Sequence, residues 1–294
     1  NDIAVSQGIL KQVSEAYRKI RNTFRYLLGN IADFNYKTDA IALQDMEELD
    51  QWIIMKLHKL LEKVNKGYED CEFHVVYHAV HNFCNVDLSA IYMDIVKNRL
   101  YCDMADSKER RSCQTALYEI CVSLAQILTP ILSFTTEEVW KYLDKEDKEL
   151  SVQLSGWPQV NPDAINDELE EKWNKLLDIR SEVTKKLEEK RASKEIGKAL
   201  DAQAILYAEG ETLKLLQQME SQLASIFIVS QVTVKTMDEA PGDAYISEDV
   251  KGLGVVIAAA AGAACARCWV HFETLDENGL CPQCAAVMAA RTDK

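Results

Sequence analysis

Four cysteines near the end of the chain are spaced as two Cys-x-x-Cys pairs. Cys265 pairs with Cys268 and Cys281 with Cys284, and twelve residues separate the pairs. Each pair can form a tight turn that places two thiolates on one side, and two such turns supply four ligands for a tetrahedral zinc site. The alternative is a pair of disulfides or redox-active dithiols. We expect one structural zinc ion, because redox-active Cys-x-x-Cys motifs rarely occur doubled.

An arginine and a tryptophan lie inside this predicted zinc ribbon, at Arg267 and Trp269. In a small module a tryptophan commonly packs in the core. The alternative is an aromatic surface beside a guanidinium, which suits stacking on an unpaired RNA base and stabilises it by roughly 1–3 kcal/mol. The residue types alone leave both interpretations open.

The remaining thiols and a group of histidines have simpler interpretations. His74, His78 and His81 share a helical face and could bind a metal, but their aromatic-rich segment favours packing and hydrogen bonding. Reduced thiols are typical of the cytosol, so we expect a cytoplasmic protein. The thiols expected to pack as small hydrophobic side chains are Cys71, Cys84, Cys102, Cys113 and Cys121.

Composition limits the class of protein. The 294 residues include only 11 glycines and 5 prolines, which favours helices. No apolar run approaches the ~20 residues needed to cross a bilayer, and no secretory signal is evident. The net charge of −14 argues against a general polyanion binder, although residues 1–35 carry five basic residues against three acidic ones. The chain begins with Asn rather than Met, so we expect it to be part of a longer protein.

Apolar periodicity predicts a mainly α protein that begins with an antiparallel helical bundle. Pro130 should end one helix, and Thr135 with Glu138 has the spacing of a capping box at the next. Residues 144–165 interrupt the helical pattern. The helices expected in the bundle cover residues 6–34, 47–68, 72–85, 88–101 and 108–128.

A small α/β module should follow the bundle and lead into the ribbon. A helix containing Trp173 comes first, and three short apolar runs then have the composition of strands. The expected strands are residues 202–208, 227–235 and 254–262, with a helix over 211–223 between the first two.

Four segments resemble the C-terminal part of bacterial-type isoleucyl-tRNA synthetases. They are residues 17–34, 72–112, 128–143 and 265–284. Valyl- and leucyl-tRNA synthetases have a similar bundle, but the terminal ribbon favours the isoleucine enzyme. The resemblance implies an anticodon-binding bundle over residues 1–150, a connective helix with the α/β module over 151–254, and a zinc-binding tail over 255–294.

The resemblance also implies what the parent protein does. It would be an ATP-dependent isoleucine–tRNA ligase, acting as a monomer away from membranes. The family's catalytic signatures are absent from this chain, so ATP would bind in an upstream catalytic domain, and we expect no catalytic residue here. The expected partners are the anticodon loop of an isoleucine tRNA and that upstream domain.

In the family, the Arg and Trp of the Cys-x-Arg-Cys-Trp motif lie against the anticodon loop, which implies RNA contacts for Arg267 and Trp269. The tail is acidic and alanine-rich, so we expect it to bind by stacking while the bundle contacts phosphates. The acidic balance also leaves an alternative, a helical scaffold whose zinc ribbon docks a protein partner. The candidate phosphate contacts are Arg18, Arg21, Arg25, Arg110 and Arg111.

Overall fold

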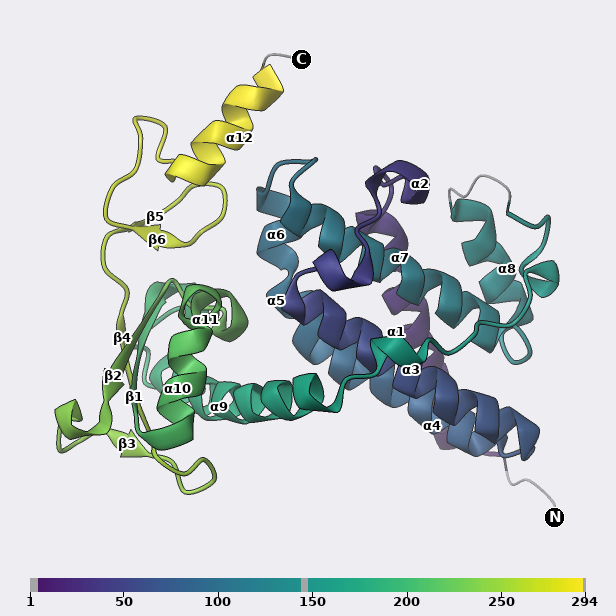
Figure 1. Ribbon diagram of the computed structural model, residues 1–294, viewed down its shortest axis with the longest axis horizontal. Helices are drawn as coiled ribbons and strands as arrows, with labels where there is room; N and C mark the ends of the chain where they lie inside the picture. The colour runs from purple at the N-terminus through teal and green to yellow at the C-terminus, as the bar shows by residue number, and fades with distance from the viewer. Residues whose placement is uncertain (1–4, 144–147, 293–294) are drawn as a thin grey trace. The chain divides into compact units, whose positions relative to one another are not determined.

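The computed structural model describes residues 5–143 and 148–292, which divide into two compact units (Figure 1). The first unit extends to Leu100 and continues over Ala105–Asn166, and the second combines Tyr101–Met104 with the chain from Asp167 onward. Part of the predicted break at 144–165, residues 144–147, lies outside the described residues. No described helix is long and apolar enough to cross a membrane.

The first unit is a helical bundle. Its longest helix, α1, has Ser6 as its N-cap, whose side chain accepts a hydrogen bond from the Ile9 amide at 3.2 Å. Helix α3 packs against α4 and α7, and α1 packs against α7. The helices are α1 (Gln7–Asn30), α2 (Tyr36–Asp39), η1 (Leu43–Asp45), α3 (Glu48–Glu69), α4 (Phe73–Asn82), η2 (Phe83–Tyr92), α5 (Met93–Ile95), α6 (Lys97–Cys102), α7 (Lys108–Leu128), α8 (Ser133–Tyr142), η3 (Val152–Leu154) and η4 (Pro162–Ala164).

Sequence periodicity predicted the long helices of the bundle but missed several of their ends, and it did not predict the short helices α2, η1, η3 and η4. Helix α7 ends at Leu128, two residues before Pro130, as expected. The predicted capping box is wrong, because α8 begins at Ser133 and Thr135 lies inside it. The Thr135 hydroxyl instead shares a 3.0 Å hydrogen bond with Tyr17.

The predicted break between residues 85 and 88 is also wrong. The chain there forms the π-helix η2, in which Phe83, Leu88 and Tyr92 are buried. A π-helix bonds residue i to i+5, so it turns apolar residues inward at a spacing that the α-helical pattern does not contain. This wider turn carries Tyr92 to a buried carboxylate.

That carboxylate, Asp50 near the start of α3, is fully buried and hydrogen-bonded from three sides. The Arg99 guanidinium donates to it at 2.9 and 3.3 Å, and the Tyr92 and Ser112 hydroxyls donate at 2.7 and 2.6 Å. Burial, followed by the Asp50 charge, raises the pKa of Tyr92 well above its usual value, so its hydroxyl stays protonated. The network therefore joins α3, η2, α6 and α7 at one buried charge.

The second unit contains a four-stranded mixed sheet. Strands β1 and β2 are parallel and are connected through α10 and α11, while β4 pairs antiparallel with β1 and β3. The long helix α9 carries acidic residues in its first turn and basic residues in its last, which suits its dipole. The elements are α9 (Asp167–Ala192), η5 (Ala199–Asp201), β1 (Ala202–Ala208), α10 (Gly210–Gln218), α11 (Glu220–Phe227), β2 (Gln231–Thr236), η6 (Met237–Glu239), β3 (Tyr245–Ile246) and β4 (Leu253–Ala259).

The strand predicted over residues 202–208 is confirmed as β1, and the other predicted α/β elements are present with shifted boundaries. The helix expected over 211–223 is two helices that meet at Met219. The strand expected from residue 227 begins at Gln231, because Phe227 ends α11 and Ile228 turns the chain with a left-handed φ of 58°. The cysteine-rich end then adds a two-stranded sheet, β5 (Ala263–Ala264) with β6 (His271–Phe272), and the helix α12 (Pro282–Thr292).

We expect Arg99→Met to lower the free energy of unfolding of the bundle by about 3–5 kcal/mol, because it leaves the buried Asp50 carboxylate without its counter-ion. Urea unfolding measures this loss. The matched control is Lys97→Met, which removes an exposed ion pair with Asp94 and should cost less than about 1 kcal/mol. Equal losses in the two variants would show that the Asp50 network does not stabilise the bundle.

Candidate metal centre and nucleic-acid interface

The four cysteine sulfurs of the predicted ribbon are gathered in one place. The Sγ atoms of Cys265, Cys268, Cys281 and Cys284 all lie within 4.8 Å of one another, so they could jointly hold a metal ion. The Cys268 and Cys281 sulfurs, which come from different pairs, are 3.9 Å apart. Within residues 5–143 and 148–292, no other group of three or more His, Cys, Asp or Glu side chains lies close enough together to share a metal ion.

Backbone amides point at these sulfurs. The Cys281 amide donates to the Cys265 Sγ at 3.3 Å, and the Cys284 amide donates to the Cys281 Sγ at 3.5 Å. Burial raises the pKa of Cys265, but backbone amides outweigh burial and lower it to about 6. Burial raises the pKa of Cys268 and of Cys281. The site therefore favours a thiolate at Cys265 directly, whereas a nearby cation would be needed to keep Cys268 and Cys281 ionised.

Trp269 follows the first cysteine pair directly and remains exposed. Its side chain keeps 59% of its accessible surface, so the interpretation as core packing is wrong. Its φ of 65° lies in the left-handed region, which costs a non-glycine residue roughly 1–2 kcal/mol. The turn imposes this angle while the Trp269 amide donates to the Cys265 carbonyl at 3.0 Å and the Cys265 amide donates to Val270 at 2.9 Å. A glycine would fit here more easily, so the fold holds an exposed indole in a conformation that its residue type disfavours.

A lysine from outside the ribbon lies beside the indole. The Lys198 Nζ is 5.5 Å from the Trp269 ring centroid, within the range of a cation–π interaction. Sequence reasoning missed Lys198 because it precedes β1, far from the cysteine pairs. Although the tail is acidic in composition, the fold therefore places a cation at its exposed aromatic surface.

Arg267 is engaged within the second unit. Its guanidinium donates to the Cys102 carbonyl at 2.6 Å and to the Tyr101 carbonyl at 2.8 Å. These carbonyls close α6, where helix ends leave acceptors unpaired and carry partial negative charge. The predicted RNA contact of Arg267 is therefore competing with a structural one, in which the guanidinium fastens the first cysteine turn to residues 101–104.

Cys102 shares the buried cluster that contains Cys265, Cys281 and Cys284. Gln283 at the start of α12 also hydrogen-bonds Asp103. Residues 101–104 are thus the support on which the ribbon rests, although more than 160 residues separate them from it. The interpretation of Cys102 as a packed thiol holds, but its neighbours are the candidate metal ligands rather than the bundle core. The same interpretation is wrong for Cys71, which is exposed.

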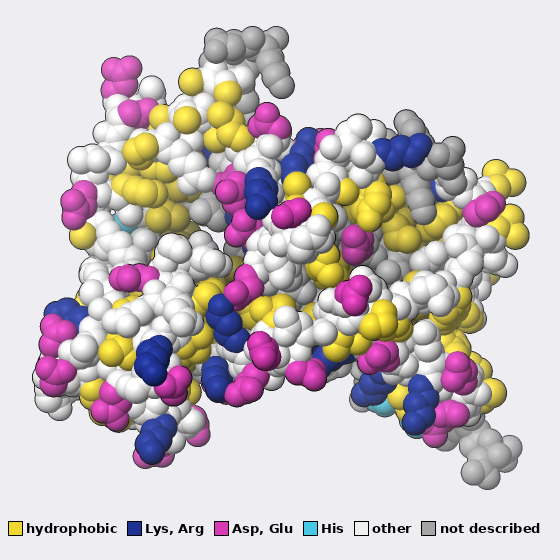
Figure 2. All heavy atoms as spheres, viewed as in Figure 1, with side chains coloured by type: hydrophobic (Ala, Val, Ile, Leu, Met, Phe, Trp, Pro, Cys, Tyr) yellow, Lys and Arg dark blue, Asp and Glu magenta, His cyan; other side chains and the backbone are white. Residues whose placement is uncertain are grey.

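The arginines of α1 keep their side chains available. Arg18, Arg21 and Arg25 are exposed, and none makes an ion pair or side-chain hydrogen bond within the described residues. Figure 2 shows basic and acidic side chains interspersed over the face it displays, with no continuous basic patch. Attraction for a polyanion therefore depends on which cations lack an acidic partner.

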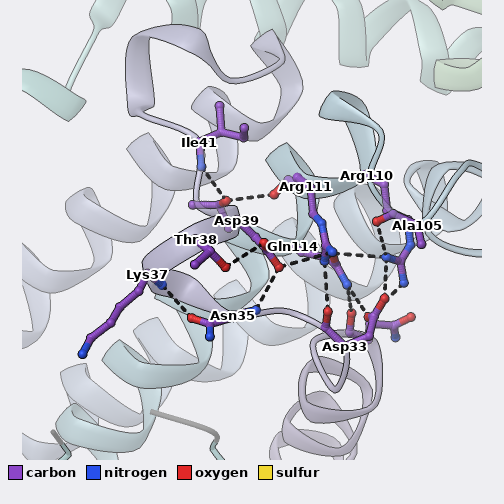
Figure 3. A network of polar contacts seen from close by, with 12 residues as sticks. Asp33, Asn35, Lys37, Thr38, Asp39, Ile41, Ala105, Arg110, Arg111 and Gln114 are labelled. Atoms are coloured by element: carbon purple, nitrogen blue, oxygen red, sulfur yellow. Dashed lines mark hydrogen bonds and ion pairs between the residues drawn. The ribbon is translucent and has the colours of Figure 1, made fainter. Parts of the chain in front are cut away.

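Arg110 and Arg111 do have acidic partners (Figure 3). Arg110 forms a two-pronged ion pair with Asp33 at 2.7 and 3.0 Å and also donates to the Leu100 and Ala105 carbonyls. Arg111 pairs with Asp39 at 3.2 Å. Only 13% and 17% of these two side chains is exposed. Arg110 lowers the pKa of Asp33, so the pair is fully charged at neutral pH. Their guanidinium groups are committed to holding the α1–α2 connection.

Of the three α4 histidines, His74 and His78 are exposed, and His78 and His81 make ring contacts with Tyr77. The Tyr77 ring lies 5.0 Å from that of His78 and 5.7 Å from that of His81, and Asn85 hydrogen-bonds the His81 ring. In the described part of the chain these histidines do not join a group that could share a metal.

Comparison with known proteins identifies the region. A family model described as the anticodon-binding domain of tRNA ligase matches residues 50–206. The isoleucine–tRNA ligases of Moorella thermoacetica and Syntrophomonas wolfei are each 47% identical over 293 residues, covering 98% of this chain and 32% of those proteins. That of Desulforudis audaxviator is 46% identical over 292 residues. The chain spans about a third of the length of the curated relatives it matches.

We expect Arg267→Gln to loosen the ribbon by about 1.5–3 kcal/mol, the usual contribution of charged hydrogen bonds. Hydrogen exchange at the Ala266 amide, which donates to the Gly279 carbonyl at 2.9 Å, reports on this change. Arg267→Lys is the control, because an ammonium keeps the charge but cannot reproduce the forked geometry. If the exchange rate of the Ala266 amide is unchanged in Arg267→Gln, Arg267 does not stabilise the ribbon.

Proposed function

Because the chain belongs to the family of tRNA-ligase anticodon-binding domains, we propose that it is the tRNA-recognising region of an isoleucine–tRNA ligase. In this proposal the helical bundle contacts the anticodon arm, and the zinc ribbon places Trp269 against an unpaired base of the loop. Ligation of isoleucine with ATP belongs to the rest of the parent protein, which is also the region's partner. The exposure of the strained indole carries the proposal.

The four-cysteine group suits zinc. A tetrahedron with Zn–S bonds of about 2.3 Å has edges of about 3.8 Å, and the Cys268–Cys281 sulfur separation is 3.9 Å. Soft thiolates disfavour magnesium and calcium, which prefer oxygen ligands. Cys265, Cys268, Cys281 and Cys284 would together fill the coordination sphere, so the ion would stabilise the ribbon and leave no position for a substrate.

The ribbon would recognise RNA through shape more than through charge. Trp269 offers a flat face, and Lys198 beside it can approach a neighbouring phosphate. Arg267 would act mainly by holding the turn that carries the indole. The phosphate contacts would come chiefly from Arg18, Arg21 and Arg25, because Arg110 and Arg111 are committed to Asp33 and Asp39.

We expect the purified, reduced chain to contain one zinc ion, and a strong chelator to unfold the ribbon while the bundle remains helical. Elemental analysis and circular dichroism measure the two effects. Protons compete with zinc for the thiolates, so retention should be weaker at about pH 5 than at about pH 7.5. If the ribbon amides of metal-free protein exchange as slowly as those of the zinc-bound protein, the site is not a structural zinc site.

We expect Trp269→Ala to weaken binding of an isoleucine-tRNA anticodon arm by about ten- to a hundredfold, the effect of losing one stacked base. Titration at fixed salt measures it, with a mismatched anticodon arm as the reference.

Trp269→Gly separates binding from stability. Glycine adopts the left-handed conformation freely, so the relief of strain should offset the lost contacts and change ribbon stability by less than about 1 kcal/mol. RNA affinity should fall as far as in Trp269→Ala. A glycine variant that binds RNA normally would show that the indole does not contact RNA, and one whose ribbon unfolds would show that the indole has a structural function.

A further inference from the structure

A fifth cysteine lies against the four candidate metal ligands, and the proposed function does not use its thiol. Cys102 is the last residue of α6 and belongs to the same compact unit as the ribbon. Only 7% of its surface is exposed, and it shares one buried cluster with Cys265, Cys281 and Cys284. Cys268, the remaining candidate ligand, is half-buried and packs against the same cluster. Three buried cysteines therefore have two further thiols beside them.

Two side chains hold Cys102 next to the second cysteine pair. One nitrogen of the Arg267 guanidinium, Nη1, donates to the Cys102 carbonyl at 2.6 Å and to the Cys284 sulfur at 3.5 Å. Gln283 hydrogen-bonds Asp103, so the residue after Cys102 is joined to the residue before Cys284. These contacts keep the Cys102 backbone beside the ribbon, and its side chain is buried among the cysteines there.

Cys102 is nevertheless outside the set of four sulfurs that all lie within 4.8 Å of one another. It is therefore not a member of the four-cysteine site, which can complete a tetrahedron around zinc without it. Zinc has no geometric preference from its d electrons, so one thiolate can replace another at little electronic cost. A buried thiol beside such a site thus has a chemistry available that a thiol in an apolar core, such as Cys121 in α7, does not have.

We propose that Cys102 is a substitute ligand, which binds the zinc ion when Cys268 is displaced. The Cys102 thiol gives up its proton as its sulfur binds, and the displaced Cys268 sulfur takes up a proton, so the charge of the site is unchanged. Cys268 is the ligand expected to leave, because the other three are buried and it is not. The inference rests on the proposed zinc site and adds a fifth donor to it.

The exchange would separate movement of the indole from loss of the metal. Cys268 directly precedes Trp269, whose left-handed backbone angle belongs to the turn between Cys265 and Cys268. Release of Cys268 would relax that turn while Cys102 keeps the ion on the other three cysteines. The metal would then also fasten the ribbon to the end of α6, which lies more than 160 residues earlier in the sequence.

Cobalt and zinc binding to the full 294-residue chain test this exchange. Cobalt(II) bound by thiolates absorbs light through sulfur-to-metal charge transfer, and the intensity rises with the number of bound thiolates. The test variants are Cys268→Ala alone and Cys268→Ala combined with Cys102→Ala. The matched control combines Cys268→Ala with Cys121→Ala, because Cys121 is also buried but lies in the bundle. A phosphine reductant keeps the thiols reduced without supplying a competing thiol.

We expect Cys268→Ala to bind one cobalt ion with the charge-transfer intensity of the wild type, because Cys102 supplies the fourth sulfur. Adding Cys102→Ala should lower this intensity to about three-quarters, since one of four thiolates is lost. It should also weaken zinc binding by about ten- to a hundredfold, as changes around a metal site commonly do. Adding Cys121→Ala should change neither quantity, and Cys102→Ala alone should leave the cobalt spectrum of the wild type unchanged.

The outcomes separate this inference from the zinc site on which it rests. A three-thiolate intensity in Cys268→Ala, or a lowered intensity in Cys102→Ala alone, overturns the substitute ligand and leaves the zinc site in place. The substitute ligand is equally overturned if neither Cys268→Ala nor the size-matched Cys268→Ser binds metal while circular dichroism shows an intact bundle. A wild-type chain that binds neither zinc nor cobalt overturns the zinc site and the inference together.

Discussion

The convergence of four sulfur atoms determines the local geometry of the last thirty residues. The turn that brings Cys265 and Cys268 together is closed by the hydrogen bond from the Trp269 amide to the Cys265 carbonyl, and Trp269 adopts a left-handed backbone conformation there. A module of this size buries too little apolar surface to hold such a turn by packing alone. In the proposed zinc site, the metal ion would supply the missing stability, and the strain at the indole would be the local cost of presenting a large aromatic side chain outward.

An acidic chain can bind a polyanion when its unpaired cations are few and well placed. The 47 acidic residues outnumber the 33 basic ones and leave a net charge of −14, so the long-range field repels a polyanion. In the proposed tRNA recognition, short-range contacts would then decide which RNA binds. Cations matched with acids, such as Arg110, maintain the fold, whereas Lys198 lies over the exposed Trp269 ring. This division would favour selectivity over affinity, because a wrong RNA would gain little from charge alone.

Local patterns predicted the long helices of the bundle, the strands β1, β2 and β4 and the cysteine cluster, since each depends on residues close together in sequence. The apolar pattern did not predict the π-helix η2, because a π-helix bonds residue i to i+5 and its apolar spacing differs from the α-helical period. Arg110 pairs with Asp33, which is 77 residues away in sequence, and Arg267 donates to the carbonyl of Cys102. Local sequence spacing cannot predict either contact, because each depends on the tertiary fold. The left-handed angle at Trp269 likewise follows from the closed turn and not from the preference of tryptophan.

The support beneath the ribbon has a consequence for how the chain can be divided. Tyr101–Met104 are encoded in the middle of the helical bundle but belong to the compact unit that begins again at Asp167. No single cut in the gene separates the two units, because a fragment ending near residue 166 would retain Cys102 and the end of α6 without the arginine that satisfies its carbonyls. The two units are therefore interleaved in sequence, and an insertion or exchange of either one during evolution would have to preserve four residues of the other.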